Sequence, residues 1–220
     1  MALTKYNYNS FNVTPVASKA LGFNSGANGL TTVTEGSMVL IKTVTASSDS
    51  TIEFVDGTSD VVLDNTYPIY KFVWINVHPS ADGGRFTFQA NAAGGSGYNE
   101  TMTTTFFRSA HTEAGTGAAL AYQTAVDQVQ GTGFSPLSYA MSNANDASHS
   151  GYLHLFNPSS TTFVTHFMAT TNEMNDSPGS YQNFVAGYFN TTSAIDEIQF
   201  KMDGGNIDAG TFKLYGIKDS

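Results

Sequence analysis

Short runs of β-branched and aromatic residues recur along the chain, separated by clusters of Gly, Asn, Asp, Ser and Pro. Such runs at fairly even spacing are typical of an all-β protein. Ten strands are too many for one flat sheet of ordinary size, so we expect two antiparallel sheets packed as a β-sandwich. The clearest predicted strands span residues 37–45, 51–55, 69–78, 85–90, 102–108, 152–156, 162–170, 184–189, 195–202 and 211–217.

Alternation along these strands predicts which faces meet water. In the strand over 195–202, apolar residues at 198, 200 and 202 alternate with Gln199 and Lys201, which indicates one buried and one solvated face. The run 72–75, Phe-Val-Trp-Ile, is apolar on both faces. It therefore indicates either a central strand covered on both sides or a strand that contributes to a subunit contact.

Turn residues predict three antiparallel strand pairs. The Asp-Gly-Gly sequence at 82–84, the Asn-Pro-Ser-Ser sequence at 157–160 and the Gly-rich segment 203–210 each separate two predicted strands. Glycine supplies positive φ in tight turns, and proline ends a strand. Only residues 118–129 resemble a helix, and β-branched residues weaken that pattern, so we expect at most a short helix or an ordered loop there.

The first 35 residues carry scattered aromatic residues without a sustained period. We therefore expect an irregular N-terminal arm or cap over residues 1–35, followed by a β-sandwich domain over 36–220. No apolar leader opens the chain, and no run approaches the ~20 apolar residues that cross a bilayer. These features predict a soluble protein made in the cytoplasm.

Charged residues make up only 12% of the 220 residues, and the formal net charge is −9. With two arginines, Arg85 and Arg108, the chain offers little attraction to phosphate, so nucleic acid and anionic membranes are poor candidate partners. The absence of cysteine excludes disulfides, thiolate metal sites and a Cys nucleophile. The surface is expected to consist mainly of neutral amides and hydroxyls.

No common catalytic motif of hydrolases, zinc proteases or nucleotide-binding proteins occurs in the sequence. His154 and His166 lie on neighbouring predicted strands, and pairing Phe156 with Phe163 would place these histidines on opposite faces. A shared metal ion is therefore not expected.

The carboxylates give no catalytic pair either. Asp196 and Glu197 are adjacent in a strand, so their side chains should point to opposite faces instead of forming paired acids. Asp56 and Asp60 lack the glycine and terminal glutamate of a calcium loop and are interpreted as turn residues. We therefore predict no catalytic residue, no cofactor and no metal site.

Aromatic residues offer a candidate platform for stacking on sugar rings, formed by Trp74, Tyr70, Tyr152 and Tyr188. Aromatic side chains in strands more often belong to a core or a subunit contact. The platform is therefore the less favoured interpretation of these four residues.

Four segments resemble structural proteins of marine tailed bacteriophages. They are YKFVWINVHP at 70–79, GYLHLFNPSSTTFV at 151–164, AGYFNTTSAI at 186–195 and FKMDGGNIDAGTFKLYGI at 200–217. The resemblance implies a virion component with a β-sandwich of the jelly-roll type, and short antiparallel strands with long end loops also suit that fold. The resemblance does not imply a catalytic role for any residue of this sequence.

Two roles are compatible with this resemblance. The first is a non-enzymatic decoration (cement) protein on the outside of the capsid, a homotrimer in contact with the major capsid protein. Its candidate docking arm comprises Tyr6, Tyr8, Phe11 and Phe23. The alternative is a tail or head fibre module that recognises host surface glycans through loops at 91–98, 142–150 and 172–180.

Overall fold

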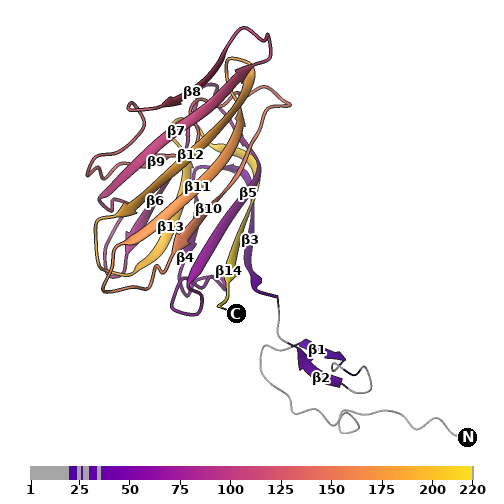
Figure 1. The fold of residues 1–220 in the computed structure, drawn as a ribbon, viewed down its shortest axis with the longest axis vertical. Coiled ribbons are helices and arrows are strands. Elements are labelled where there is room, and N and C mark those ends of the chain that lie inside the picture. Colours follow the sequence, from indigo (N-terminus) through magenta and orange to yellow (C-terminus); the bar gives the residue numbers. More distant parts are fainter. Residues whose placement is uncertain (1–19, 24–25, 27–29, 34–35, 220) are drawn as a thin grey trace, which may run out of the picture. The chain divides into compact units, whose positions relative to one another are not determined.

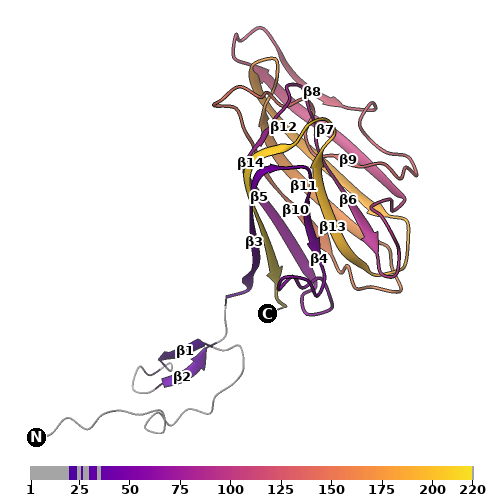
Figure 2. The same ribbon diagram turned by 180° about the vertical axis from the view of Figure 1, so that it is seen from behind.

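The structure is a computed structural model that describes residues 20–23, 26, 30–33 and 36–219. The chain forms two compact units, Met1–Val39 and Leu40–Ser220. Within the larger unit, two sheets lie face to face, as seen from opposite sides in Figure 1 and Figure 2. The expected all-β, antiparallel, two-sheet architecture is thereby confirmed.

In the smaller unit, β1 (Ala20–Phe23) pairs with β2 (Leu30–Val33) in an antiparallel hairpin. Sequence periodicity did not reveal this hairpin, because strands of four residues are too short to show a clear alternation. Of the candidate docking residues, Phe23 lies at the end of β1 with its side chain exposed. Tyr6, Tyr8 and Phe11 lie outside the described residues.

The remaining strands build a large and a small sheet. The large sheet has the strand order β3-β14-β5-β10-β11-β12-β7-β8, and the small sheet has the order β4-β13-β6-β9. The strands are β3 (Met38–Asp49), β4 (Ile52–Val55), β5 (Ile69–Pro79), β6 (Phe86–Ala92), β7 (Met102–Thr112), β8 (Ala118–Tyr122), β9 (Ser135–Pro136), β10 (His149–Phe156), β11 (Thr165–Met174), β12 (Gly179–Phe189), β13 (Ile195–Met202) and β14 (Ile207–Ile217).

One of the three predicted hairpins is confirmed. β10 and β11 pair on either side of the loop that begins at Asn157. The segments 82–84 and 203–210 instead carry the chain from one sheet to the other, because β5 and β14 belong to the large sheet while β6 and β13 belong to the small one. Turn residues indicate that the chain reverses, and they contain no information on which sheet the next strand joins.

The helix considered over 118–129 is wrong. Residues Ala118–Tyr122 form β8, which pairs with β7 from Phe107 to His111. The weak helical spacing is overridden by the hydrogen bonds that an adjacent strand edge offers. Val126, one of the residues that suggested the helix, is buried in the core from the loop that follows β8.

The core consists largely of aromatic rings from both sheets. Phe86 and Phe200 of the small sheet stack with centroids 5.6 Å apart, and the ring of Trp74 from β5 lies 5.3 Å from Phe86. Phe88 packs edge-on against Phe167 of β11 at 5.0 Å. Each of these five side chains is almost completely buried, so they join the sheets into one hydrophobic core.

Beyond the small sheet, a loop closes the inner side of the large sheet. The backbone N–H groups of Tyr139 and Ala140 donate hydrogen bonds to the buried carboxylate of Glu173. The guanidinium of Arg108 lies 3.6 Å from the ring centre of Tyr139 and 4.6 Å from that of Tyr181. These contacts tie the loop to β7, β11 and β12 by hydrogen bonds and cation–π stacking.

A buried hydrogen bond links two of the core rings. The indole Nε1–H of Trp74 donates to Nδ1 of His149 over 3.0 Å, so the proton of the neutral imidazole resides on Nε2. His149 has no exposed surface, and this burial lowers its pKa to about 3. The folded protein therefore holds His149 neutral across the whole physiological pH range.

His149 makes stability fall with acidification. In the unfolded chain, the histidine binds a proton below about pH 6.5, whereas in the folded protein it does so only near pH 3. Above pH 6.5, His149 is neutral in both states and does not make the free energy of unfolding depend on pH. As the pH falls from 6.5 toward 3, that free energy decreases, with a slope approaching about 1.4 kcal/mol per pH unit. We expect His149→Asn, which keeps an acceptor for Trp74, to flatten this dependence.

The test is urea unfolding of both proteins between pH 7 and pH 4.5. Carboxylates elsewhere titrate equally in the two proteins, so the difference between the two slopes isolates His149. Parallel slopes would contradict the assignment.

Candidate functional site

The outer face of the large sheet carries three rows of side chains that cross adjacent strands. Along β10, Leu153 and Leu155 are buried whereas Tyr152 and His154 are not, so the latter point away from the core. We call this surface the aromatic face. Its rows, in strand order from β5 to β7 or β8, are Ile69, Phe156, His166, Tyr188 and Thr103; Lys71, His154, Met168, Ala186 and Thr105; and Val73, Tyr152, Thr170, Phe184, Phe107 and Tyr122.

Rings contact one another across this face without being covered. Phe107 and Phe184 stack with centroids 4.8 Å apart, although Phe107 is exposed. His166 lies 5.9 Å from Tyr188, and Tyr152 lies 5.2 Å from His154. Such contacts hold the rings in fixed positions on the pleated surface.

Two hollows lie on either side of the middle row. The first, of about 250 Å³, is lined by middle-row residues together with Tyr152, Phe184 and Phe107. The second, of about 440 Å³, is lined by middle-row residues together with Phe156, His166 and Tyr188. Both hollows exist because the small middle-row side chains Ala186 and Thr105 lie between larger rings. Met168, 56% exposed, lines both hollows.

The three rows contain no carboxylate, although the chain has a net charge of −9. The ammonium of Lys71 lies 4.6 Å from the ring centre of Tyr152, in a cation–π contact. Partial burial, together with the nearby charge of Lys71, lowers the pKa of His154. The three rows therefore combine apolar rings with groups that are neutral or positive, and the only carboxylate bonded to them among the described residues is that of Asp127, which accepts the Tyr122 hydroxyl at the β8 edge.

Carboxylates gather instead beside the small sheet. Glu53 of β4 accepts a hydrogen bond from the side chain of Gln199 of β13. Glu197 lies on the same strand as Gln199 and pairs with Val55 of β4. Burial, followed by the charge of Glu197, raises the pKa of Asp196. The strict alternation predicted at 196 and 197 is interrupted by a β-bulge between Ile195 and Glu197.

The candidate sugar platform is divided between the core and the surface. Tyr152 and Tyr188 lie on the aromatic face, but Trp74 is 1% exposed and Tyr70 is completely buried. Tyr70, Phe72 and Trp74 of β5 point toward the small sheet, and the Tyr70 hydroxyl donates to the backbone oxygen of Asp64. A platform of four rings is therefore wrong, because two of them face the opposite side of the sheet.

The structure shows how the four apolar residues at 72–75 of β5 are divided between the two faces of the sheet. Phe72 and Trp74 enter the core, whereas Val73 and Ile75 lie on the outer face, where Ile75 is exposed. β5 is central in the sheet but is covered on one side only within the described part of the chain.

The register expected for the two histidines is wrong. Phe156 pairs with His166 instead of Phe163, so His154 and His166 lie on the same outer face, in neighbouring strands. The Ser160 hydroxyl accepts the N–H of Phe163 and holds this segment in a loop, which delays β11 until Thr165. Among the described residues, no group of three or more acidic or histidine side chains could hold a metal ion.

Sequence reasoning missed Phe107, Phe184 and Met168 as surface residues. A signal was available, because consecutive phenylalanines at 106 and 107 cannot both face one core from a regular strand. The spacing of Phe184 and Tyr188 likewise places both on one face.

No protein-family model, curated protein or solved structure matches this chain. Within the described ranges, no helix is long and apolar enough to span a bilayer.

The opposite orientations of Trp74 and Tyr152 predict opposite consequences of truncation. Trp74→Ala leaves a cavity in the core and should cost about 3–5 kcal/mol of unfolding free energy. Tyr152→Ala removes a partly exposed ring (36%) and should cost about 1 kcal/mol or less. Urea unfolding at neutral pH measures both values. A larger loss for Tyr152→Ala would contradict the placement of these rings.

Proposed function

We propose that this chain is a non-enzymatic structural protein of a tailed bacteriophage virion, a decoration protein bound to the outside of the head as a homo-oligomer. The observation that carries the proposal is the exposed aromatic face, whose rows contain no acidic residue in an otherwise acidic chain. One carboxylate, that of Asp127, lies at the β8 edge of the face, where it accepts a hydrogen bond from Tyr122. Contiguous exposed apolar surface of this kind typically marks a protein contact. The four segments that resemble phage structural proteins are the reason for placing this contact in a virion.

The chemistry of the face suits a long-lived contact with the capsid. Stacked rings such as Phe107 and Phe184 contribute apolar area that gains free energy when water is excluded. Hydroxyls of Thr105 and Thr170 cost less to desolvate than carboxylates would. Lys71 adds an attraction to acidic groups on the capsid.

The course of the chain supports the jelly-roll assignment. Strands β3 to β6 alternate between the two sheets, and each pairs with strands from later in the chain. β3 and β5 lie beside β14, while β4 and β6 lie beside β13. A ribbon of paired strands wound into two sheets is the arrangement that defines a jelly roll.

The first test is localisation and rebinding. Electron microscopy of particles labelled with an antibody against this chain should show label over the head. Purified protein added to heads that lack it should bind, and Met168→Glu should weaken this binding at least about tenfold, because an unpaired buried charge costs several kcal/mol.

Thr58→Glu is the matched control, since Thr58 is exposed in the loop after β4, away from the aromatic face. It should bind like the wild type. Label found only on the tail, or equal binding by Met168→Glu, would refute the head assignment.

The second candidate function is recognition of host surface glycans by a fibre module. The specific observation in its favour is the pair of hollows with aromatic walls, to which Tyr152 and Tyr188 contribute one ring each. Aromatic rings stack on the apolar faces of sugars, and nearby hydroxyls and amides can bond their hydroxyl groups.

Glycan recognition predicts that the purified protein binds host cells or their surface polysaccharide. Tyr152→Ala should then reduce binding at least about tenfold, since stacking of this kind contributes above 1 kcal/mol, and Thr58→Glu should not. Absence of binding at micromolar concentration would exclude this function and leave the capsid contact as the remaining role of the face.

A further inference from the structure

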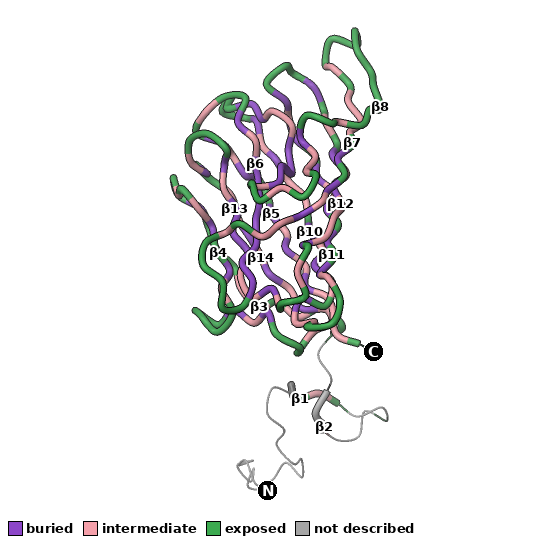
Figure 3. The backbone as a smooth tube through the Cα atoms, turned by 90° about the vertical axis from the view of Figure 1, so that its left-hand side faces the viewer, coloured by how far each residue is buried: buried purple, intermediate pink, exposed green. Residues whose placement is uncertain are grey.

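Strand β8 forms one edge of the large sheet and has a single neighbouring strand, β7. Figure 3 shows the β7–β8 hairpin extending from the end of the larger unit with most of β8 exposed. We propose that β8 pairs antiparallel with β8 of a second copy across a two-fold axis, which joins two large sheets into one. This inference is independent of the virion assignment.

The hydrogen bonds of the hairpin determine which backbone groups face the open edge. Thr112 N–H donates to Gly117 O over 3.0 Å, and Gln123 N–H donates to Phe106 O over 2.8 Å. In an antiparallel ladder, alternate residues bond the neighbouring strand, so residues of β8 with odd numbers face β7. Ala118, Leu120 and Tyr122 therefore direct their N–H and C=O groups away from it.

Strand β8 itself has none of the features that usually prevent strand addition, and the one charge next to it, the carboxylate of Asp127, is engaged by the Tyr122 hydroxyl at 2.7 Å. The sequence Ala-Ala-Leu-Ala-Tyr contains no charge and no proline, pairs with β7 without a bulge and is exposed throughout. Leu120 is 75% exposed. An uncharged, regular edge is a template for another strand.

The other edges of the two sheets are protected. β3 carries Lys42 and Asp49, and β4 carries Glu53. β9 has only two residues, one of which is Pro136. Charged side chains, proline and short length all disfavour pairing with a further strand. β8 is therefore the edge of these sheets that is best suited to receive another strand.

A second copy of β8 fits this edge because the strand is self-complementary. With Leu120 at the two-fold axis, Leu120 pairs with Leu120 of the second copy, and Ala118 pairs with its Tyr122. Each outward-facing donor then meets an acceptor. On the opposite side of the strand, only the small side chains of Ala119 and Ala121 need to be accommodated.

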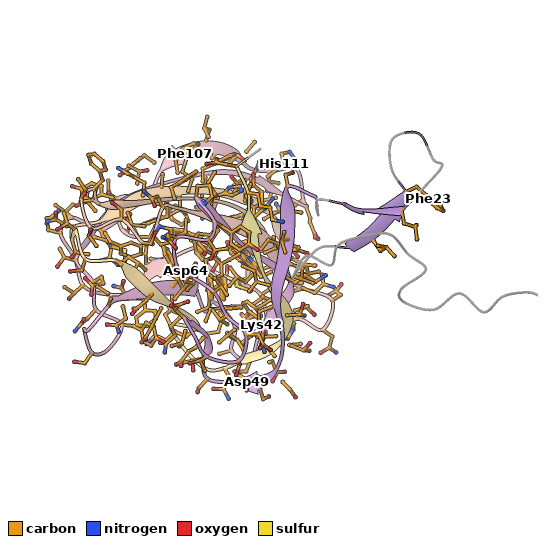
Figure 4. All side chains as sticks on the ribbon, turned by 90° about the horizontal axis from the view of Figure 1, so that it is seen from below. Phe23, Lys42, Asp49, Asp64, Phe107 and His111 are labelled. Carbon is orange, nitrogen blue, oxygen red and sulfur yellow. The ribbon has the colours of Figure 1, made fainter. Side chains whose placement is uncertain are left out.

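Continuity with the aromatic face adds apolar contact to this pairing. Tyr122 lies beside Phe107, which stacks on Phe184, so the side chains at 118, 120 and 122 extend the aromatic face to the open edge. Figure 4 labels Phe107 and His111, both on β7, at the same side of the larger unit. In the pair, two aromatic faces become one surface, and the side chains of Leu120 and Tyr122 bury part of their apolar area against those of the second copy.

The cysteine-free sequence allows a direct test with Leu120→Cys. Directly paired residues that exchange hydrogen bonds have Cα atoms about 5.5 Å apart, within the range of a disulfide. We expect mild oxidation to give a disulfide-linked dimer at micromolar concentration. Val129→Cys is the control, because Val129 is 81% exposed but lies outside β8, and it should crosslink at least about tenfold more slowly.

A second variant tests the backbone pairing. Leu120→Pro removes an N–H that faces the open edge and leaves the ladder with β7 complete, whereas Leu120→Thr keeps that N–H. Sedimentation at micromolar concentration should show dimers for the wild type and Leu120→Thr, and monomers for Leu120→Pro with an unchanged far-ultraviolet spectrum.

A wild-type monomer or trimer would overturn the proposal, as would a dimer that survives in Leu120→Pro. Should Leu120→Pro fail to fold, the relative crosslinking rates of the two cysteine variants decide. Equal rates contradict the two-fold pairing, whichever role the aromatic face has.

Discussion

The packing of aromatic rings between the two sheets sets the orientation of the other side chains in the larger unit. Phe72 and Trp74 meet Phe86 and Phe200 between the sheets, which fixes the direction of β5 side chains. Because strand residues alternate, every ring that enters this layer directs its neighbours outward. A register slip of one residue would expose the core rings, so the composition of the outer face follows from the core.

The aromatic face is thus a second apolar layer on the same sheet. The inner side is covered by the small sheet and by the loop held at Glu173 and Arg108. The outer side has no such cover among the described residues. Acidic groups lie instead near Glu53 and Glu197, so the two outer surfaces of the sandwich differ in both polarity and charge. The sandwich therefore has one outer surface rich in apolar rings and another that carries acidic groups.

Sequence patterns predicted much of the fold because alternation is a local property. The strand over 195–202 has the predicted bounds, and Ile198, Phe200 and Met202 face the core as its alternation predicted, but Gln199, on the side expected to meet water, is buried as well. Sheet membership depends on contacts distant in sequence, which is why the reversal at 82–84 suggested a hairpin instead of a crossing. The same limit applies to β8, whose strand state depends on β7.

Residue type alone was a weaker guide to the candidate site. Trp74 and Tyr152 both suit stacking on a sugar, yet only the pairing of β5 with β10 shows that they point to opposite sides. The exposed pair of Phe107 and Phe184 required a register of β7 against β12 that no local pattern contains. A surface assembled from several neighbouring strands therefore becomes visible only once the sheet order is known.

The hydrogen bond between Trp74 and His149 has a practical consequence. Trp74 is the only tryptophan in the chain, and it lies against Phe86 in the centre of the core. Its fluorescence is therefore a reporter of a single site that changes when the two sheets separate. Events confined to the aromatic face or to the edge of β8 leave its surroundings intact, so one emission spectrum distinguishes loss of assembly from loss of fold.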